Sequence, residues 1–224
     1  MSDGLFAQYR EASGYYAANW QAIDLALYDL CRKHPDHQRP DGVHAKLNII
    51  GRTYATGIER AVRSRKYQGS AMESLCRHFW SCRHDLDMAM RPLASIGETL
   101  TLANLNDILT AHGKVVSLIL PALRPNRTPR SFVSKYLHFH CPAVPIYDSV
   151  ADHELKRLIR WCSRLEVIPL PKDADERYGK FCLRFWQLLE QLRQSGDDVS
   201  VKLMDNFILW QERERQGVNG GAQP

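Results

Sequence analysis

Several features that mark exported, membrane-bound or disulfide-bonded proteins are missing from this 224-residue chain. No apolar run approaches the roughly 18 residues that a membrane-spanning helix needs, and the first residues lack a cationic start followed by an apolar segment. The six cysteines form no Cys-x-x-Cys pair, which argues against a disulfide framework. We therefore expect a cytoplasmic protein with reduced cysteines, no cofactor, no bound metal and no membrane partner.

One cluster of cysteines and histidines, Cys76-Arg-His78-Phe-Trp-Ser-Cys82-Arg-His84, invites interpretation as a zinc site. Its two cysteines lie six residues apart, and a helix carries residues at that separation to different faces. An ordinary helix is therefore the favoured interpretation of this segment.

Strict alternation of apolar and polar residues, which is typical of strands, is nearly absent, and no Pro/Gly/Ser-rich linker divides the chain. Apolar residues instead recur every three or four positions, as in amphipathic helices. Breakers separate these stripes at residues 35–42, at Arg91 and Pro92, at Gly113 and at residues 196–198. The pattern predicts an all-α fold: a single globular helical domain over residues 1–215, followed by a flexible tail over residues 216–224. The stripes cover residues 16–30, 47–62, 72–90, 181–192 and 203–208.

Acidic residues are also absent from one long stretch, residues 108–147, which holds five Lys or Arg. Residues 31–66 hold nine Lys or Arg against three Asp or Glu, so the net charge of +5 hides two strongly basic stretches. This asymmetry is typical of a protein with one face that meets a polyanion, and double-stranded DNA is the expected partner. The alternative is that these basic residues are simply solvated on helix surfaces.

Three prolines, at positions 121, 125 and 129, prevent a continuous helix across the second basic stretch. Thr128 is the expected N-cap of a helix that begins at Pro129, which gives a helix, a basic hairpin and a second helix. Backbone amides that open a helix beside arginines form a seat for a phosphate group. The expected DNA-binding residues of the hairpin are Arg124, Asn126, Arg127 and Arg130.

Asp148 follows Val144-Pro145-Ile146-Tyr147 and opens a further helix. Together with Ser131-Phe-Val-Ser134, this segment resembles the helix-hairpin-helix (HhH-GPD) superfamily of DNA glycosylases. Their motif is a hairpin, a helix and a Val-Pro-Val/Ile-Asp segment that carries the catalytic aspartate. The resemblance covers about thirty residues. It implies that Asp148 is the catalytic carboxylate of an enzyme that hydrolyses the N-glycosidic bond of a modified base. A simple helix N-cap is the alternative role for Asp148.

The chain departs from the family pattern at three places. The segment Arg124-Pro-Asn-Arg-Thr-Pro-Arg130 lacks the glycines of the family hairpin, and Tyr147 is inserted before the aspartate. Arg130 stands where bifunctional members carry a lysine nucleophile, which implies a monofunctional enzyme. Lys135, five residues further on, remains a second catalytic candidate, although a structural or phosphate-binding role is favoured for it.

A base flipped out of DNA needs aromatic walls and polar groups at its edge. For most of these side chains, a place in the hydrophobic core is the competing interpretation. Because His138 and His140 flank Phe139, at most one of them can face the site. The candidate walls are Trp20, Tyr16, Tyr54 and Tyr147, and the candidate polar groups are Arg52, Glu59, His138 and His140.

The sequences Ser-Lys-Tyr-Leu-His-Phe-His and Pro-Ile-Tyr-Asp-Ser are also similar to those of bacterial antiviral glycosylases that attack α-glucosylated hydroxymethylcytosine in phage DNA. That resemblance implies base excision in antiphage defence, by a protein that we expect to be a monomer. A non-enzymatic DNA-binding module is the first alternative. A helical interaction protein with no nucleic-acid partner is the second.

Overall fold

The computed structural model describes residues 2–54, 56–63, 69–160, 169–194 and 199–219 of the chain. Helices account for 76% of the structure, and no described residue belongs to a strand. A single isolated β-bridge, among the residues described, pairs Val62 with Leu123. The all-α prediction is therefore confirmed.

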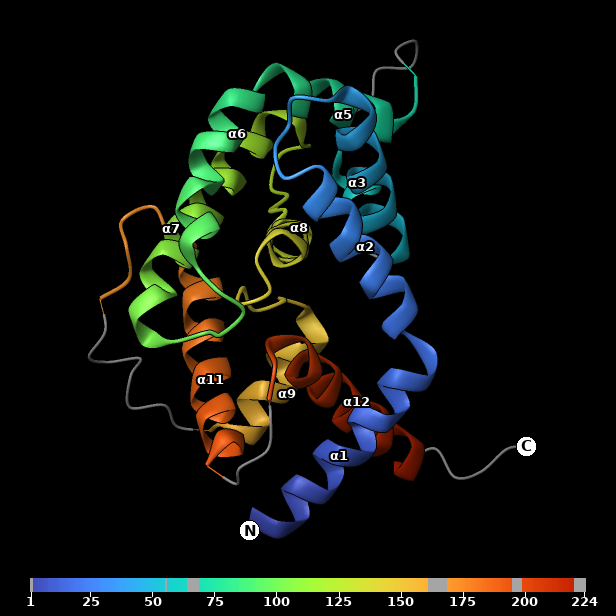
Figure 1. The fold of residues 1–224 in the computed structure, drawn as a ribbon, viewed down its shortest axis with the longest axis vertical. Coiled ribbons are helices and arrows are strands. Elements are labelled where there is room, and N and C mark those ends of the chain that lie inside the picture. The colour runs from blue at the N-terminus through green and yellow to red at the C-terminus, as the bar shows by residue number, and fades with distance from the viewer. Residues whose placement is uncertain (1, 55, 64–68, 161–168, 195–198, 220–224) are drawn as a thin grey trace.

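Helix α8 (Arg130–His140) lies at the centre of the molecule, where Figure 1 looks almost along its axis. All eight residues from position 132 to 139 are buried, as expected of a helix that neighbours surround on every side. Helices α2, α3 and α7 pack directly against it. The remaining bounds are α1 (Ser2–Asn19), α2 (Gln21–Lys33), α3 (Pro40–Thr53), α4 (Ile58–Ala61), α5 (Ala71–Ser81), α6 (Arg83–Met90), the 3₁₀ turn η1 (Arg91–Ser95), α7 (Leu102–Ile119), the 3₁₀ turn η2 (Leu120–Ala122), α9 (Ser149–Leu158), α11 (Glu176–Arg193) and α12 (Val201–Asn219).

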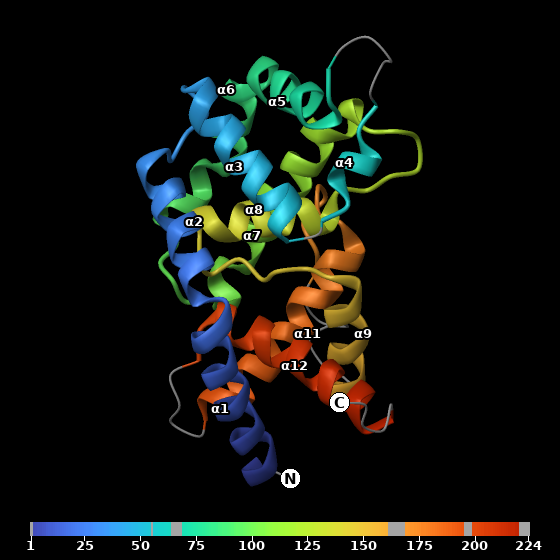
Figure 2. The ribbon, with the colours of Figure 1, turned by 90° about the vertical axis from the view of Figure 1, so that its right-hand side faces the viewer.

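The first and last helices lie side by side at one end of the molecule, as both Figure 1 and Figure 2 show. The ring of Tyr9 on α1 meets that of Phe207 on α12 edge to face, with centroids 5.8 Å apart. Gln211 on α12 donates a hydrogen bond of 2.9 Å to Gln8. Helix α12 also packs on α9, so α1 and α12 together close the end of the fold below α8.

Two predicted helices are each divided by a turn. The stripe over residues 16–30 breaks at Trp20, whose backbone (φ −127°, ψ −22°) separates α1 from α2 and leaves the side chain 44% exposed. The stripe over residues 47–62 breaks after Thr53, and Gly57 takes a left-handed φ of +68° before the short α4. The first break moves Trp20 out of the core, where the spacing had placed it.

Two further boundaries differ from the sequence prediction. The stripe over residues 72–90 divides at Cys82, where the Ser81 hydroxyl and the Cys82 thiol both donate to the carbonyl of His78. Gly113, expected to end a helix, lies inside α7 instead. A Cβ at this position would lie 1.7 Å from the carbonyl oxygen of Asp173, so the glycine allows the segment before α11 to approach α7 closely.

Helix α12 runs to Asn219, so residues 216–219 belong to a helix rather than to the predicted tail. The rest of that tail, residues 220–224, lies outside the described residues. The predicted break at residues 196–198 and the sixth cysteine, Cys162, also fall outside them.

Candidate functional site

A cavity of about 340 Å³ opens between the paired terminal helices and the segment that joins α8 to α9. Its walls combine aromatic rings with charged side chains, a mixture typical of small-molecule sites. The aromatic residues are Tyr15, Tyr16, Trp20, Tyr54 and Trp210. The charged residues are Asp24, Lys135, Asp148, Lys202, Asp205 and Arg213.

Lys135 and Asp148 form an ion pair in one wall of the cavity, with 3.5 Å between Lys135 Nζ and Asp148 Oδ2. Lys135 also donates a 3.0 Å hydrogen bond to the carbonyl of Tyr54, and its side chain is 8% exposed. Asp148 is the N-cap of α9, because its Oδ1 accepts the backbone N–H of Val150 at 2.9 Å. Its side chain remains 30% exposed, so one carboxylate is fixed in orientation yet reachable by a ligand.

The segment that carries Asp148 is fastened to α8. The backbone N–H of Tyr147 donates to the Ser134 hydroxyl at 2.9 Å, and Tyr178 donates to the carbonyl of Pro145 at 2.7 Å. Ile146 lines the cavity and is 2% exposed. These contacts hold Asp148 in place relative to Lys135.

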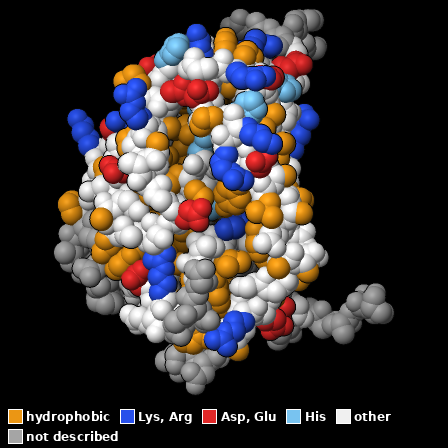
Figure 3. All heavy atoms as spheres, in the orientation of Figure 1, with side chains coloured by type: hydrophobic (Ala, Val, Ile, Leu, Met, Phe, Trp, Pro, Cys, Tyr) orange, Lys and Arg blue, Asp and Glu red, His pale blue; other side chains and the backbone are white. Residues whose placement is uncertain are grey.

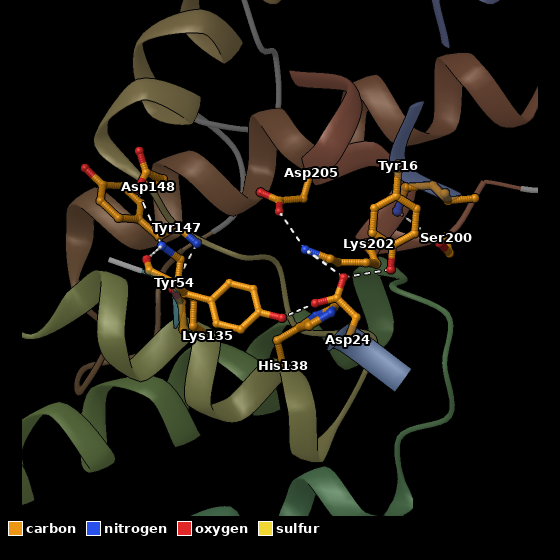
Figure 4. A network of polar contacts seen from close by, with 12 residues as sticks. Tyr16, Asp24, Tyr54, Lys135, His138, Tyr147, Asp148, Ser200, Lys202 and Asp205 are labelled. Carbon is orange, nitrogen blue, oxygen red and sulfur yellow. Dashed lines mark hydrogen bonds and ion pairs between the residues drawn. The ribbon is translucent and has the colours of Figure 1, made fainter. Parts of the chain in front are cut away.

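A second polar network forms the opposite wall, and Figure 4 shows both groups together. Asp24 on α2 accepts hydrogen bonds from the hydroxyls of Tyr16, at 2.7 Å, and Tyr54. Lys202 on α12 lies between two carboxylates, 3.4 Å from Asp24 and 3.5 Å from Asp205. Tyr54 therefore connects the two networks, since its carbonyl binds Lys135 and its hydroxyl binds Asp24.

Burial shifts the ionisation of several of these groups. It raises the pKa of Asp205, and the nearby Asp148 carboxylate adds to that shift while Lys202 and Lys135 oppose it. Burial and the hydrogen bond to Asp24 raise the pKa of both Tyr16 and Tyr54, so both hydroxyls stay protonated donors.

Of the residues that the sequence singled out, the cavity brings together Tyr16, Trp20, Tyr54, Lys135 and Asp148. They come from four separate parts of the chain.

Arg52, expected at the edge of the base, does not line the cavity. It is exposed on the last turn of α3 and pairs with Glu59 at 2.8 Å. Both side chains lie largely in solvent, so the pair can satisfy its charges without any ligand.

The two histidines and Tyr147 also lie outside the cavity lining. His138 is fully buried, donates to the carbonyl of Val144 at 2.8 Å and meets the Tyr28 hydroxyl at 2.5 Å, while burial lowers its pKa to about 3. His140 accepts from Lys46 at 3.3 Å, and burial lowers its pKa as well. Tyr147 is 4% exposed. The structure therefore does not bring these three predicted substrate contacts to the cavity, because residues 132–139 of α8 are buried among other helices and Tyr147 is buried as well.

The residues predicted to form the hairpin fall in and beside a loop over residues 123–129, between η2 and α8. It carries Arg124, Asn126 and Arg127 as exposed residues, and Asn126 takes a left-handed φ of 60°. The backbone N–H of Arg124 donates to the carbonyl of Ala61 at 2.8 Å, which ties the loop to the last residue of α4. Thr128 does not cap α8. Pro129 occupies the N-cap position without a side-chain hydrogen bond.

Arg130 is largely buried, unlike the exposed residues of the loop before it. It pairs with Asp175, the N-cap of α11, at 2.6 Å, and the two side chains are 19% and 12% exposed. Its guanidinium also lies 5.2 Å from the centre of the Tyr147 ring. These contacts give Arg130 a structural role in joining α8 to α11, which does not favour the predicted phosphate contact.

A second hollow of about 440 Å³ lies beside this loop, between Thr56, Gly57, Arg60 and Ala61 on one side and Arg127 and Thr128 on the other. Arg60 and Arg127 are exposed, and neither makes an ion pair with a described residue. Thr53 and Tyr54 line the first hollow, and Thr56 and Gly57 line the second. On the face seen in Figure 3, by contrast, basic side chains are interspersed with acidic ones.

The sequence analysis missed Asp24, Lys202, Asp205, Asn206 and Trp210, which line the cavity from α2 and α12. Asp24 and Asp205 sit within apolar stripes and are 2% and 3% exposed. A charged residue at a buried position of a stripe is the signal that could have identified them.

The described residues include no helix that is long and apolar enough to cross a bilayer. Comparisons of the chain with protein-family models, with curated proteins and with solved structures found no match.

Proposed function

We propose that the protein is a DNA glycosylase that hydrolyses the N-glycosidic bond of a modified base and leaves an abasic site. The observation that carries the proposal is the Lys135–Asp148 ion pair in the wall of an aromatic-lined cavity. A partly exposed carboxylate next to a pocket for a planar group is what this reaction requires.

Asp148 performs the chemical step in this proposal. Cleavage of the bond between C1′ and the base releases the base with the bonding electron pair and leaves an oxocarbenium-like sugar, which a fixed carboxylate stabilises. Water then adds to C1′, and the proton it loses neutralises the departing base. The Val150 N–H holds one oxygen of Asp148 and Lys135 engages the other, so the carboxylate needs little reorganisation when charge develops. Because Lys135 is already engaged with Asp148 and the Tyr54 carbonyl, we assign it a positioning role and propose a monofunctional enzyme.

The aromatic cavity receives the flipped base. At about 340 Å³ it lies near the lower end of the range of about 300–1,000 Å³ that is typical of ligand pockets. Trp20 and Trp210 offer ring surface, and Trp20 stands partly exposed at the break between α1 and α2. Base stacking on such rings contributes about 1–3 kcal/mol per base.

The exposed loop before α8 contacts the DNA backbone in this proposal. Arg124, Arg127 and Arg60 offer charge that no described acidic residue neutralises, and Thr56 and Gly57 of the second hollow lie close in sequence to Thr53 and Tyr54 of the cavity. Phosphate contacts of this kind fix register without reading sequence. We propose a monomer that acts on double-stranded DNA. Duplex containing α-glucosylated hydroxymethylcytosine is the first substrate to test, given the resemblance of residues 134–140 to antiphage glycosylases.

One observation favours a second candidate, a DNA-binding module without catalysis. The hydrogen bond from Val150 to Asp148 is an ordinary N-cap, and such caps occur on helices with no catalytic role.

A screen for base release separates the two. The protein is incubated with duplexes that each hold one modified or unmodified base, and alkali then cleaves the strand wherever an abasic site has formed. Cleavage of at least one modified duplex is the result expected of a glycosylase. Salt-sensitive binding without cleavage of any duplex would indicate the binding module, and the absence of salt-sensitive binding would exclude both.

A further inference from the structure

Two buried polar atoms of cavity-lining residues on α12 have no hydrogen-bond partner among the described residues. Asp205 Oδ1 and Asn206 Nδ2 are buried, and neither makes a hydrogen bond with any described residue. Both residues line the cavity, and Asp205 is only 3% exposed. The other oxygen of Asp205 lies 3.5 Å from Lys202 Nζ, while Oδ1 points away from Lys202, toward the side on which Asp148 is drawn in Figure 4.

Such atoms are uncommon in folded proteins, because a buried polar atom without a hydrogen bond costs about 1–3 kcal/mol. Here the cost falls on two neighbouring residues in the wall of one cavity. A ligand that supplied one donor and one adjacent acceptor would remove both costs together.

We infer that Asp205 and Asn206 bind the hydrogen-bonding edge of a nucleobase, with an N–H of the base donating to Asp205 and an adjacent base atom accepting from Asn206. Every standard base carries a donor next to an acceptor on the edge it uses for pairing. The substrate class is therefore a base whose pairing edge is unmodified, so that the distinguishing modification lies elsewhere on the base. This inference rests on the proposed function, because a base in duplex DNA exposes that edge only when it is flipped.

The charges around the two residues agree with this assignment. Lys202 bridges Asp205 to Asp24, and Asp24 also holds the Tyr16 hydroxyl. The carboxylate thus has one oxygen fixed inside the protein and one left for the ligand. Burial raises the pKa of Asp205, and an N–H donor from a base would favour its ionised form.

The test uses pairs of neutral nucleosides that differ at the pairing edge: uridine with 3-methyluridine, cytidine with N4,N4-dimethylcytidine and adenosine with N6,N6-dimethyladenosine. Trp20 and Trp210 line the cavity, so tryptophan fluorescence reports binding without any need for catalysis. At least one parent nucleoside should bind about 5-fold to 100-fold more tightly than its methylated partner, the discrimination expected of one well-placed hydrogen-bond pair.

Three variants assign that preference to Asp205. Asp205→Leu should abolish it, and Asp205→Asn should keep it in part because the amide oxygen still accepts a hydrogen bond. Asp152→Leu is the matched control, since Asp152 is a buried aspartate of α9 that does not line the cavity, and this variant should keep the full preference. Circular dichroism verifies that each variant is folded.

Three results would overturn the inference: no binding of any parent nucleoside up to about 10 mM, equal binding of both members of every pair, or a preference that survives in folded Asp205→Leu. The proposed function fails separately. If no duplex releases a base while the nucleoside preference is observed, the glycosylase activity is excluded and the base-binding site remains supported. Base release without any preference at the pairing edge would support the glycosylase and exclude the proposed contacts of Asp205 and Asn206.

Discussion

Replacing Asp148 by asparagine should nearly abolish base release while leaving the fold and DNA binding in place. The substitution removes the negative charge, and the amide oxygen can still accept the hydrogen bond from the Val150 N–H that caps α9. The charge matters most when the sugar becomes positive in the transition state, and it would repel phosphates in the ground state.

The expected effect on stability follows from the two contacts of Asp148. The cap hydrogen bond is retained, and the ion pair with Lys135 is long, at 3.5 Å, and partly solvated on the carboxylate side. Such a pair contributes about 0–1 kcal/mol, so the free energy of unfolding should fall by about 1 kcal/mol or less. For a chain of this length that lowers the Tm by about 2–4 °C. The rate should fall about 10²-fold to 10³-fold, the effect of removing one electrostatic stabiliser.

The assay is base release under single-turnover conditions on the best duplex from the screen, with a binding isotherm and a thermal unfolding curve for the same samples. Asp152→Asn is the control, because Asp152 lies on the same helix and binds Lys156 and Arg177 instead of facing the cavity. It should lose stability but keep its rate per folded molecule. Near wild-type release by folded Asp148→Asn would refute the catalytic assignment and leave Asp148 as a helix cap.

The remaining predictions concern the loop, the lysine in the cavity and a lysine in the core. Changing both Arg124 and Arg127 to alanine should weaken binding to all duplexes and reduce the slope of log affinity against log salt by up to about 1.8, at about 0.9 per phosphate contact; an unchanged slope would exclude the loop from the interface. Borohydride should trap no covalent protein–DNA adduct; an adduct that disappears in Lys135→Ala would make Lys135 the nucleophile. Burial lowers the pKa of Lys46 from 10.5 to about 8. Between pH 8 and pH 10.5 the Lys46 side chain is therefore largely protonated in the unfolded chain and largely neutral in the folded protein. The free energy of unfolding of the wild type, relative to Lys46→Met, should therefore rise by about 3 kcal/mol from pH 8 to pH 10.5 in urea titrations, and a flat difference would contradict the assignment.

Apolar spacing was enough to predict the helices but not where they break. The turn at Trp20 occurs because α1 must pack on α12 while α2 packs on α8, and no local residue marks that change of partner. At Gly113 the sequence predicted a break where the helix continues. The glycine is needed there because the carbonyl of Asp173 approaches α7 too closely for a Cβ. Both outcomes depend on segments distant in sequence.

Only those cavity residues that lie in a recognisable local motif could be predicted from the sequence. Asp148 could be found from the proline-rich segment before it. Asp24 and Asp205 could not be paired from sequence, because they lie 181 positions apart along the chain. His138 and His140 do not line the cavity for a related reason: at most one of them was expected to face the site, but residues 132–139 of α8 are all buried.

The docking of α12 on α1 has a consequence for the order of events during synthesis. Ribosomes release the N-terminal part of a chain first, so α8 and the start of α9 are available to fold while α12 is still being made. A nascent chain at that stage carries Lys135 and Asp148 without Lys202, Asp205 or the ring of Trp210, which belong to the last helix. Under the proposed function, such a chain presents the carboxylate without the α12 residues that we infer to hold the base. Synthesis of α12 is thus the step that completes the described lining of the cavity.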